Sequence, residues 1–245
     1  MRRYLALSRS LIYSALFAVP LLLLYEAGAL WLARSGSSGL RNGADVLLRT
    51  LLAAGGLGGT TALTLLLLGG AALLVVVDRR RHRVRLEGRV FLGMLAESTL
   101  LALVFGVVVG TATRLVLDAV LPRLAADNGI LGILPLHEGI VLSLGAGVYE
   151  ELVFRVLLVG GLLAALRGGG IHRSTARPVA AIAAALAFSA FHYVGPYADP
   201  WALGSFTFRF IAGLAFSALF LARGFGITAW THALYDVFLL LGRGI

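Results

Sequence analysis

The chain has 245 residues, of which 59% are hydrophobic and 13% charged, and this composition excludes an ordinary water-soluble domain. The shortage of charge excludes a disordered chain, and the lack of cysteine excludes a disulfide framework and thiol chemistry. All 21 basic residues are arginine, and the formal net charge is +9. Because most of these arginines lie between apolar runs, we expect them to meet lipid headgroups rather than nucleic acid.

Apolar runs long enough to cross a bilayer core of about 30 Å recur along the whole chain. They predict an all-α, polytopic transmembrane helical bundle of about seven spans, within a range of six to eight. The predicted spans cover residues 11–33, 46–77, 90–112, 137–165, 178–195, 204–222 and 225–242. The first run is too long for a cleaved secretion signal and contains Glu26, so we expect it to be retained as a span.

The segment between the third and fourth predicted spans, residues 113–135, mixes charged residues and Pro122 with apolar ones. This mixture favours an amphipathic stretch at the membrane interface, or a partial dip into the bilayer, over a full span. With a cytoplasmic N-terminus, the predicted spans place most arginines on the cytoplasmic side, as the positive-inside rule requires. We therefore predict a multi-pass protein of the cell membrane with its N-terminus in the cytoplasm. Residues 1–136 carry no recognised motif, whereas residues 137–245 carry the polar residues that predict chemistry.

Three predicted spans contain ionisable residues, which are costly inside a membrane and therefore indicate function. They are Glu150, Glu151 and Arg155 in the fourth span, His192 in the fifth, and His232 and Asp236 in the seventh. Clustering around one hydrated cavity is the least costly way to keep such residues in a bilayer. Helix–helix hydrogen bonding without catalysis is the simpler interpretation of each one taken alone.

The spacing within each span predicts local pairs. Glu151 and Arg155 are four residues apart on a helix and can form an ion pair. Glu150 points about 100° away from Glu151, so its partner or its role lies elsewhere. His232 and Asp236 are also four residues apart, so that a hydrogen bond between them can fix the imidazole tautomer.

Two chemical roles suit such a group of glutamates and histidines. Glu150 can deprotonate water directly while a histidine supplies a proton or stabilises an oxyanion. Alternatively, His192 and His232 can hold a divalent metal such as zinc, which activates the water. The two histidines lie in different spans without the short spacing of a strong metal motif, so the metal stays open.

The order Glu-Glu-x-x-x-Arg, Phe-x-x-x-His and His-x-x-x-Asp, each on its own span, resembles the CPBP family of intramembrane proteases. This family is also called the CAAX protease and bacteriocin-processing or abortive infection family. The resemblance covers residues 137–240. It implies that Glu150 is the water-activating base and that Glu151 is its neighbour, tethered by Arg155. It also implies that His192 and His232 complete the catalytic cavity, with Phe188 packing beside them.

Asp236 departs from the family pattern, in which Asn commonly stands at this position. Asp donates a hydrogen bond only when protonated, so we expect Asp236 to orient His232 or to help hold a metal rather than to bind an oxyanion. The resemblance implies a peptide or protein substrate. Prenylated, membrane-anchored proteins are one substrate class of the family, but nothing in the sequence indicates recognition of a prenyl chain, and bacteriocin-like or other peptides are equally open.

Two other functions are compatible with the same residues. A non-catalytic membrane scaffold or immunity protein could keep the fold with its polar cluster intact. A proton-coupled transporter also buries Glu, His and Arg, but the chain lacks an evident inverted repeat. The sequence indicates no oligomeric state.

Overall fold

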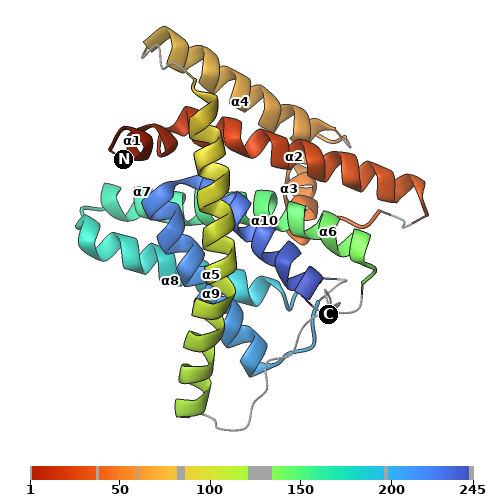
Figure 1. The fold of residues 1–245 in the computed structure, drawn as a ribbon, viewed down its shortest axis with the longest axis vertical. Helices are drawn as coiled ribbons and strands as arrows, with labels where there is room; N and C mark the ends of the chain where they lie inside the picture. Colours follow the sequence, from red (N-terminus) through yellow and green to blue (C-terminus); the bar gives the residue numbers. More distant parts are fainter. Residues whose placement is uncertain are drawn as a thin grey trace.

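The chain folds as the all-α bundle that its composition predicts (Figure 1). The computed structural model describes residues 2–36, 39–59, 61–81, 86–120, 134–195 and 198–242, and within these ranges it contains no strand. Five of the described helices are long and apolar enough to cross a membrane. They are α2 (Leu11–Arg34), α5 (Gly88–Val120), α8 (Arg173–Phe191), α9 (Leu203–Arg223) and α10 (Phe225–Gly242).

Two further stretches bring the fold close to the predicted number of spans. Helix α4 (Ala62–Arg81) contains a shorter apolar segment, Ala62–Asp78. Residues 136–168 form one uninterrupted helical run, which the hydrogen-bond pattern divides into four parts. The parts are α6 (Leu136–Gly145), η2 (Ala146–Glu150), η3 (Leu152–Val159) and α7 (Gly160–Gly168). The prediction of about seven spans is therefore broadly consistent with the structure. The short helix α1 (Arg2–Ser8) precedes all of these.

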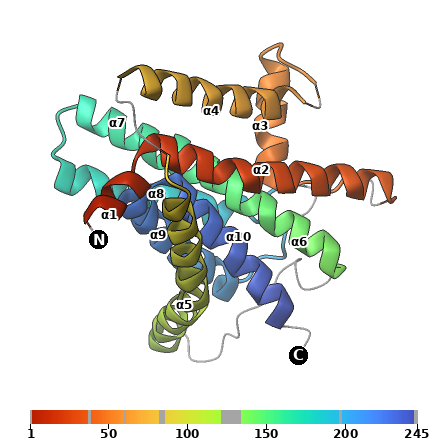
Figure 2. The same ribbon diagram turned by 45° about the horizontal axis from the view of Figure 1, so that its top comes forward.

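The predicted span 46–77 is wrong, because two helices replace it. Helix α3 (Gly43–Ala54) ends at Ala54, with Gly55 as its C-cap, and α4 starts only at Ala62. Between them, Gly56 and Gly59 have φ of 83° and 141°, a backbone conformation that glycine adopts readily and that stops a helix. Helix α3 is about 18 Å long, which is too short to cross the hydrocarbon core. It stands at a steep angle to α4 (Figure 2).

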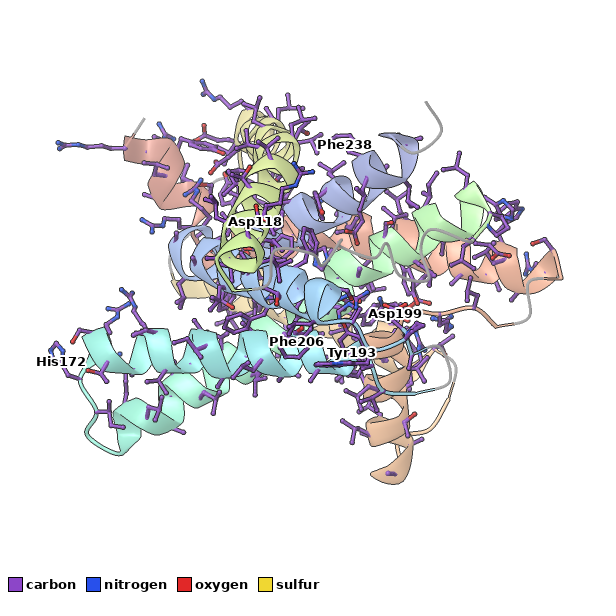
Figure 3. All side chains as sticks on the ribbon, turned by 90° about the horizontal axis from the view of Figure 1, so that it is seen from below. Asp118, His172, Tyr193, Asp199, Phe206 and Phe238 are labelled. Carbon is purple, nitrogen blue, oxygen red and sulfur yellow. The ribbon has the colours of Figure 1, made fainter. Side chains whose placement is uncertain are left out.

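Two other boundaries differ from the prediction. Helix α5 continues through residues 113–120, so the first part of the predicted interfacial segment belongs to this long helix, with Asp118 near its end (Figure 3). Residues 121–133, which include Pro122, lie outside the described residues. Helix α8 ends at Phe191 rather than at residue 195, and this places His192 at the end of the helix.

Helix α10 lies in the middle of the bundle, in contact with α2, α5, α6, α9 and η2 (Figures 1 and 2). Glycines make these contacts close. A Cβ atom added at Gly147 would lie 2.4 Å from the carbonyl oxygen of Ala229, and one added at Gly226 would lie 2.5 Å from that of Ser14. Neither position has room for a side chain, so glycine sets the distance of α10 from η2 and from α2.

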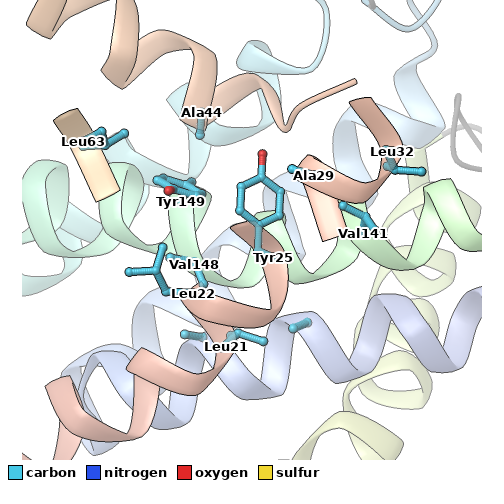
Figure 4. Close-up of a cluster of buried hydrophobic side chains, with 12 residues drawn as sticks. Leu21, Leu22, Tyr25, Ala29, Leu32, Ala44, Leu63, Val141, Val148 and Tyr149 are labelled. Atoms are coloured by element: carbon cyan, nitrogen blue, oxygen red, sulfur yellow. The ribbon is translucent and has the colours of Figure 1, made fainter. Parts of the chain in front are cut away.

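A buried hydrophobic cluster joins α2, α3 and α4 to α6, η2 and α10 (Figure 4). At its centre the rings of Tyr25 and Tyr149 meet edge to face, with centroids 5.2 Å apart. A Cβ atom on Gly145 would lie 2.5 Å from the Tyr25 ring, so this glycine lets the helical run of residues 136–168 approach α2 closely. The cluster therefore fixes η2, which ends at Glu150, against the helices of the N-terminal part.

Candidate active site

The two adjacent glutamates lie in a part of the chain with π-helical hydrogen bonding. Glu150 ends η2, and Glu151 separates η2 from η3. Such i→i+5 segments are rare in proteins and occur frequently at functional sites. Both side chains are buried, with relative exposures of 7% for Glu150 and 0% for Glu151. They face different neighbours, because Glu150 bonds to α3 and Glu151 bonds to α10. The expectation that Glu150 has its partner outside its own helix is thereby confirmed.

Glu151 joins His232 to Arg155. Its Oε1 lies 2.7 Å from Nδ1 of His232, and its Oε2 lies 3.2 Å from Nε of Arg155. The predicted ion pair between Glu151 and Arg155 is confirmed. The guanidinium of Arg155 also lies over two aromatic rings, 4.4 Å from the centroid of Phe188 and 5.3 Å from that of Phe216. Cation–π contacts of this kind lower the cost of burying the arginine.

The imidazole of His232 is held from three sides. Glu151 binds Nδ1, and Oδ2 of Asp236 lies 3.5 Å from Nε2. Phe216 stacks on the ring with centroids 4.4 Å apart. Asp236 therefore lies beside His232 as its spacing predicts, but the short hydrogen bond that fixes the ring comes from Glu151 on another helix. The sequence did not indicate this pairing.

His192 is oriented by the end of its own helix. Its Nδ1 lies 2.9 Å from the carbonyl oxygen of Phe188, and because a carbonyl only accepts, Nδ1 carries the hydrogen. Nε2 is then the nitrogen left to contact water or substrate. The Phe188 ring lies between the two histidines, with its centroid 5.0 Å from that of His192 and 6.2 Å from that of His232.

Glu150 lies close enough to both histidines for all three groups to interact electrostatically. The Glu150 carboxylate has one Coulombic interaction with His192 and another with His232. Thus η2, the end of α8 and the middle of α10 bring together the residues that the sequence assigned to one cavity. Their catalytic roles remain predictions.

Residues 132–238 match the family model described as type II CAAX prenyl endopeptidase Rce1-like. This segment is similar to the Rce1-like family. The sequence-based resemblance to CPBP proteases is therefore confirmed, and the match supports a CAAX-type protease in a multi-pass membrane protein. The Rce1-like segment starts just before α6, ends within α10, and contains both glutamates and both histidines. No curated protein and no solved structure gives a significant match to the chain.

One polar partner of the site comes from outside the Rce1-like segment. Asn42, at the start of α3, donates a hydrogen bond from Nδ2 to Oε1 of Glu150 over 2.8 Å. No sequence pattern pointed to this residue. Asn followed by Gly before an amphipathic stretch indicates a helix start, but it gives no sign of a contact 108 positions further along the chain.

The described part of the Rce1-like segment presents no ready-made metal site. Among the described residues, no group of three or more His, Asp and Glu side chains is arranged to hold a metal ion. Both nitrogens of His232 face carboxylates, and Nδ1 of His192 is bonded to a carbonyl. A zinc ion held by His192 and His232 would require one of these contacts to break. As arranged, the residues thus do not fit a metal ion held by both histidines.

Arg209, in α9, binds residues that follow His192. It forms an ion pair with Asp199, donates to Ser205 over 2.8 Å, and lies over the Tyr193 ring. The backbone N–H of Asp199 donates to the carbonyl of His192 over 2.9 Å. Figure 3 shows Tyr193 and Asp199 close to Phe206 of α9. This arrangement ties the backbone at His192 to α9.

Proposed function

We propose that the chain is an intramembrane endopeptidase that hydrolyses a peptide bond at or near the membrane, with a water molecule activated by Glu150. The observation that carries this proposal is the burial of the Glu150 carboxylate next to two histidines within an Rce1-like segment. A buried carboxylate near imidazoles is suited to general base catalysis, because it can take a proton from water and return it later in the reaction.

The proposed reaction has two steps. Glu150 accepts a proton from water while the water oxygen forms a bond to the carbonyl carbon of the peptide. The carbonyl oxygen then carries the negative charge, which a histidine stabilises once its free ring nitrogen carries a proton. An electron pair of the oxyanion then re-forms the C=O bond, the electron pair of the C–N bond goes to the nitrogen, and the amine leaves with the proton that Glu150 had accepted. Products are a carboxylic acid and an amine, and Glu150 is regenerated.

The two histidines are proposed to assist in different ways. His192 has only Nε2 available, and because Nδ1 carries the hydrogen, Nε2 accepts a hydrogen bond from the attacking water. His232 is fixed by Glu151 and is flanked by Asp236, which supports an orienting role for both acids. Arg155 is proposed to balance the charge of Glu151 in the dry interior.

The substrate is proposed to be a peptide or protein segment held at the membrane, with prenylated proteins as the first class to test because of the Rce1-like match. The lipid bilayer is the proposed surroundings of the enzyme. We place it in the cell membrane with a cytoplasmic N-terminus, on the basis of the arginine distribution.

The test compares protein termini by mass spectrometry in membranes from cells that carry the wild-type chain, Glu150→Gln or Glu138→Gln at matched abundance. Glu138→Gln makes the same chemical change twelve positions earlier, in the first turn of α6. We expect new termini with the wild type and with Glu138→Gln, and none with Glu150→Gln.

Identical termini in all three membranes, with each chain folded, would contradict proteolysis and favour a scaffold or immunity protein. A pH-dependent solute flux that Glu150→Gln abolishes would instead indicate a proton-coupled transporter. If cleavage is found, metal analysis of the active, purified protein separates direct water activation from a metal mechanism.

A further inference from the structure

Asn42 starts α3 and is buried next to Glu150, although it lies outside the Rce1-like segment. It caps the helix, since its Oδ1 accepts a hydrogen bond from the backbone N–H of Ala44 over 2.9 Å. A backbone N–H can only donate, so this contact fixes which end of the amide is the oxygen. The Nδ2 end therefore faces Glu150, and Asn42 presents a donor to the carboxylate.

The backbone of Asn42 is held as firmly as its side chain. Its N–H donates to the hydroxyl oxygen of Tyr25 over 3.1 Å, and that hydroxyl donates to Oδ2 of Asp45 over 2.8 Å. On the other side, a Cβ atom at Gly145 would lie 2.9 Å from the Asn42 Cβ. Asn42 is thus confined between α2 and the helical run that carries Glu150.

Four charged side chains fix α3 in this position, and we call them the α3 clamp: Glu26, Arg41, Asp45 and Arg49. Each carboxylate accepts hydrogen bonds from both arginines, over distances of 2.6–3.2 Å. Tyr149, the residue before Glu150, donates to Oε1 of Glu26 over 2.7 Å. Burial lowers the pKa of Arg41, but Asp45 and Glu26 outweigh it and raise the pKa above its ordinary value, so Arg41 stays charged.

We propose that Asn42 is a positioning residue for the reaction: it holds Oε1 of Glu150 and so presents Oε2 to the attacking water. The inference rests on the proposed function of Glu150. A carboxylate without this donor could rotate about its terminal bond, which is a soft torsion. With Oε1 engaged by Asn42, Oε2 is the oxygen left to accept a proton. The N-terminal part of the chain would then contribute directly to the geometry of the site.

The test uses the fact that Asn, Ser and Asp cap helices about equally well. Asn42→Ser keeps the cap, but its side chain is too short to reach Glu150. Asn42→Asp also keeps the cap, but it places a second carboxylate where the donor was. A purely structural role predicts similar activity for all three chains. The positioning role predicts the order Asn, Ser, Asp from most to least active.

We expect Asn42→Ser to lower kcat by roughly 10- to 100-fold, as the loss of a hydrogen bond to a charged group implies, with little change in KM or in the unfolding midpoint. The substrate is a synthetic peptide spanning the bond identified by the comparison of termini. Ser10→Ala is the matched control, because Ser10 caps α2 far along the chain from the site. It should leave kcat unchanged.

A second comparison covers the case in which Asn42→Asp is too unstable to assay. In the double variant Asn42→Asp/Glu150→Gln, donor and acceptor are exchanged, so the unfolding midpoint should recover while cleavage stays absent.

Wild-type kcat in Asn42→Ser would overturn the inference, as would equal losses of kcat and stability in Asn42→Ser and Ser10→Ala. Retained cleavage in Glu150→Gln would contradict the proposed function itself. Loss of cleavage in Glu150→Gln together with unchanged kcat in the Asn42 variants would contradict only the positioning role of Asn42.

Discussion

The α3 clamp and the group around Glu151 both bury acids next to arginines, yet they differ in how completely the charges are satisfied. In the clamp, two carboxylates and two guanidiniums bond to one another in every combination. Around Glu151, Oε2 of the glutamate and Nε and Nη1 of Arg155 are buried without a hydrogen bond, although the two groups form an ion pair. Complete pairing is typical of a structural element, whereas incompletely satisfied buried charge is costly and indicates a functional site.

The largest expected effect is on activity, from Glu151→Gln. Loss of this carboxylate releases His232 and should lower the cleavage rate by roughly 10²- to 10⁴-fold, the range for loss of a positioned acid–base system. It also leaves Arg155 without its acid, so the protein should become less stable. Rates are measured on the purified protein with the substrate peptide, and stability by denaturant unfolding in detergent.

The double variant Glu151→Gln/Arg155→Met separates the two effects. Met fills part of the arginine volume without charge, and replacing a buried ion pair by uncharged residues is often neutral for stability. Stability should therefore recover and activity should not. Recovery of activity in the double variant would show that the carboxylate serves only to neutralise Arg155.

Asp45→Asn tests the clamp and should act mainly on stability. Asp45 is fully buried and accepts from two arginines and from Tyr25, so its loss leaves buried charge unbalanced. We expect the free energy of unfolding to fall by about 3–5 kcal/mol. The control is the exposed Asp118, near the end of α5. Asp118→Asn should change the free energy of unfolding by less than about 0.5 kcal/mol. Equal effects of the two substitutions would contradict a structural role for the clamp.

The smallest expected effect comes from the contact between η2 and α10. Gly147→Ala inserts a methyl group against the carbonyl of Ala229 and should lower stability by about 1–3 kcal/mol, as overpacking does. The added methyl group also pushes η2 away from α10 and so separates Glu151 from His232. The cleavage rate should therefore fall as well. Gly161→Ala is the matched control, because nothing lies within 4 Å of a Cβ there. It should be neutral or slightly stabilising, as Ala favours helix. Both are compared by thermal unfolding and by rate.

Much of the fold could be predicted from the sequence, because a bilayer imposes a length on each apolar helix. The first, sixth and seventh predicted spans agree with α2, α9 and α10 to within a residue or two. The span 46–77 failed because apolar content dominated the prediction, while Gly56 and Gly59 supply the backbone conformation that ends a helix. Hydropathy cannot distinguish a glycine that permits close packing from one that breaks a helix.

The site was predictable only where its spacing is local. The pair Glu151 and Arg155 follows from helix periodicity, and so does the proximity of His232 and Asp236. The bond from Glu151 to His232 depends on how α10 docks against η2, and the bond from Asn42 to Glu150 depends on where the clamp places α3. The π-helical hydrogen bonding is equally invisible, because one extra residue per turn leaves no mark on an apolar composition.

The central place of α10 has a consequence for biosynthesis. This helix follows, along the chain, every helix that surrounds it, and therefore leaves the ribosome after them. Until α10 inserts, Glu151 lacks its partner His232, and η2 lacks the helix that packs against Gly147. The site therefore cannot assemble. Under the proposed function, a nascent chain already in the membrane is thus unable to cleave other proteins before its own synthesis has passed α10.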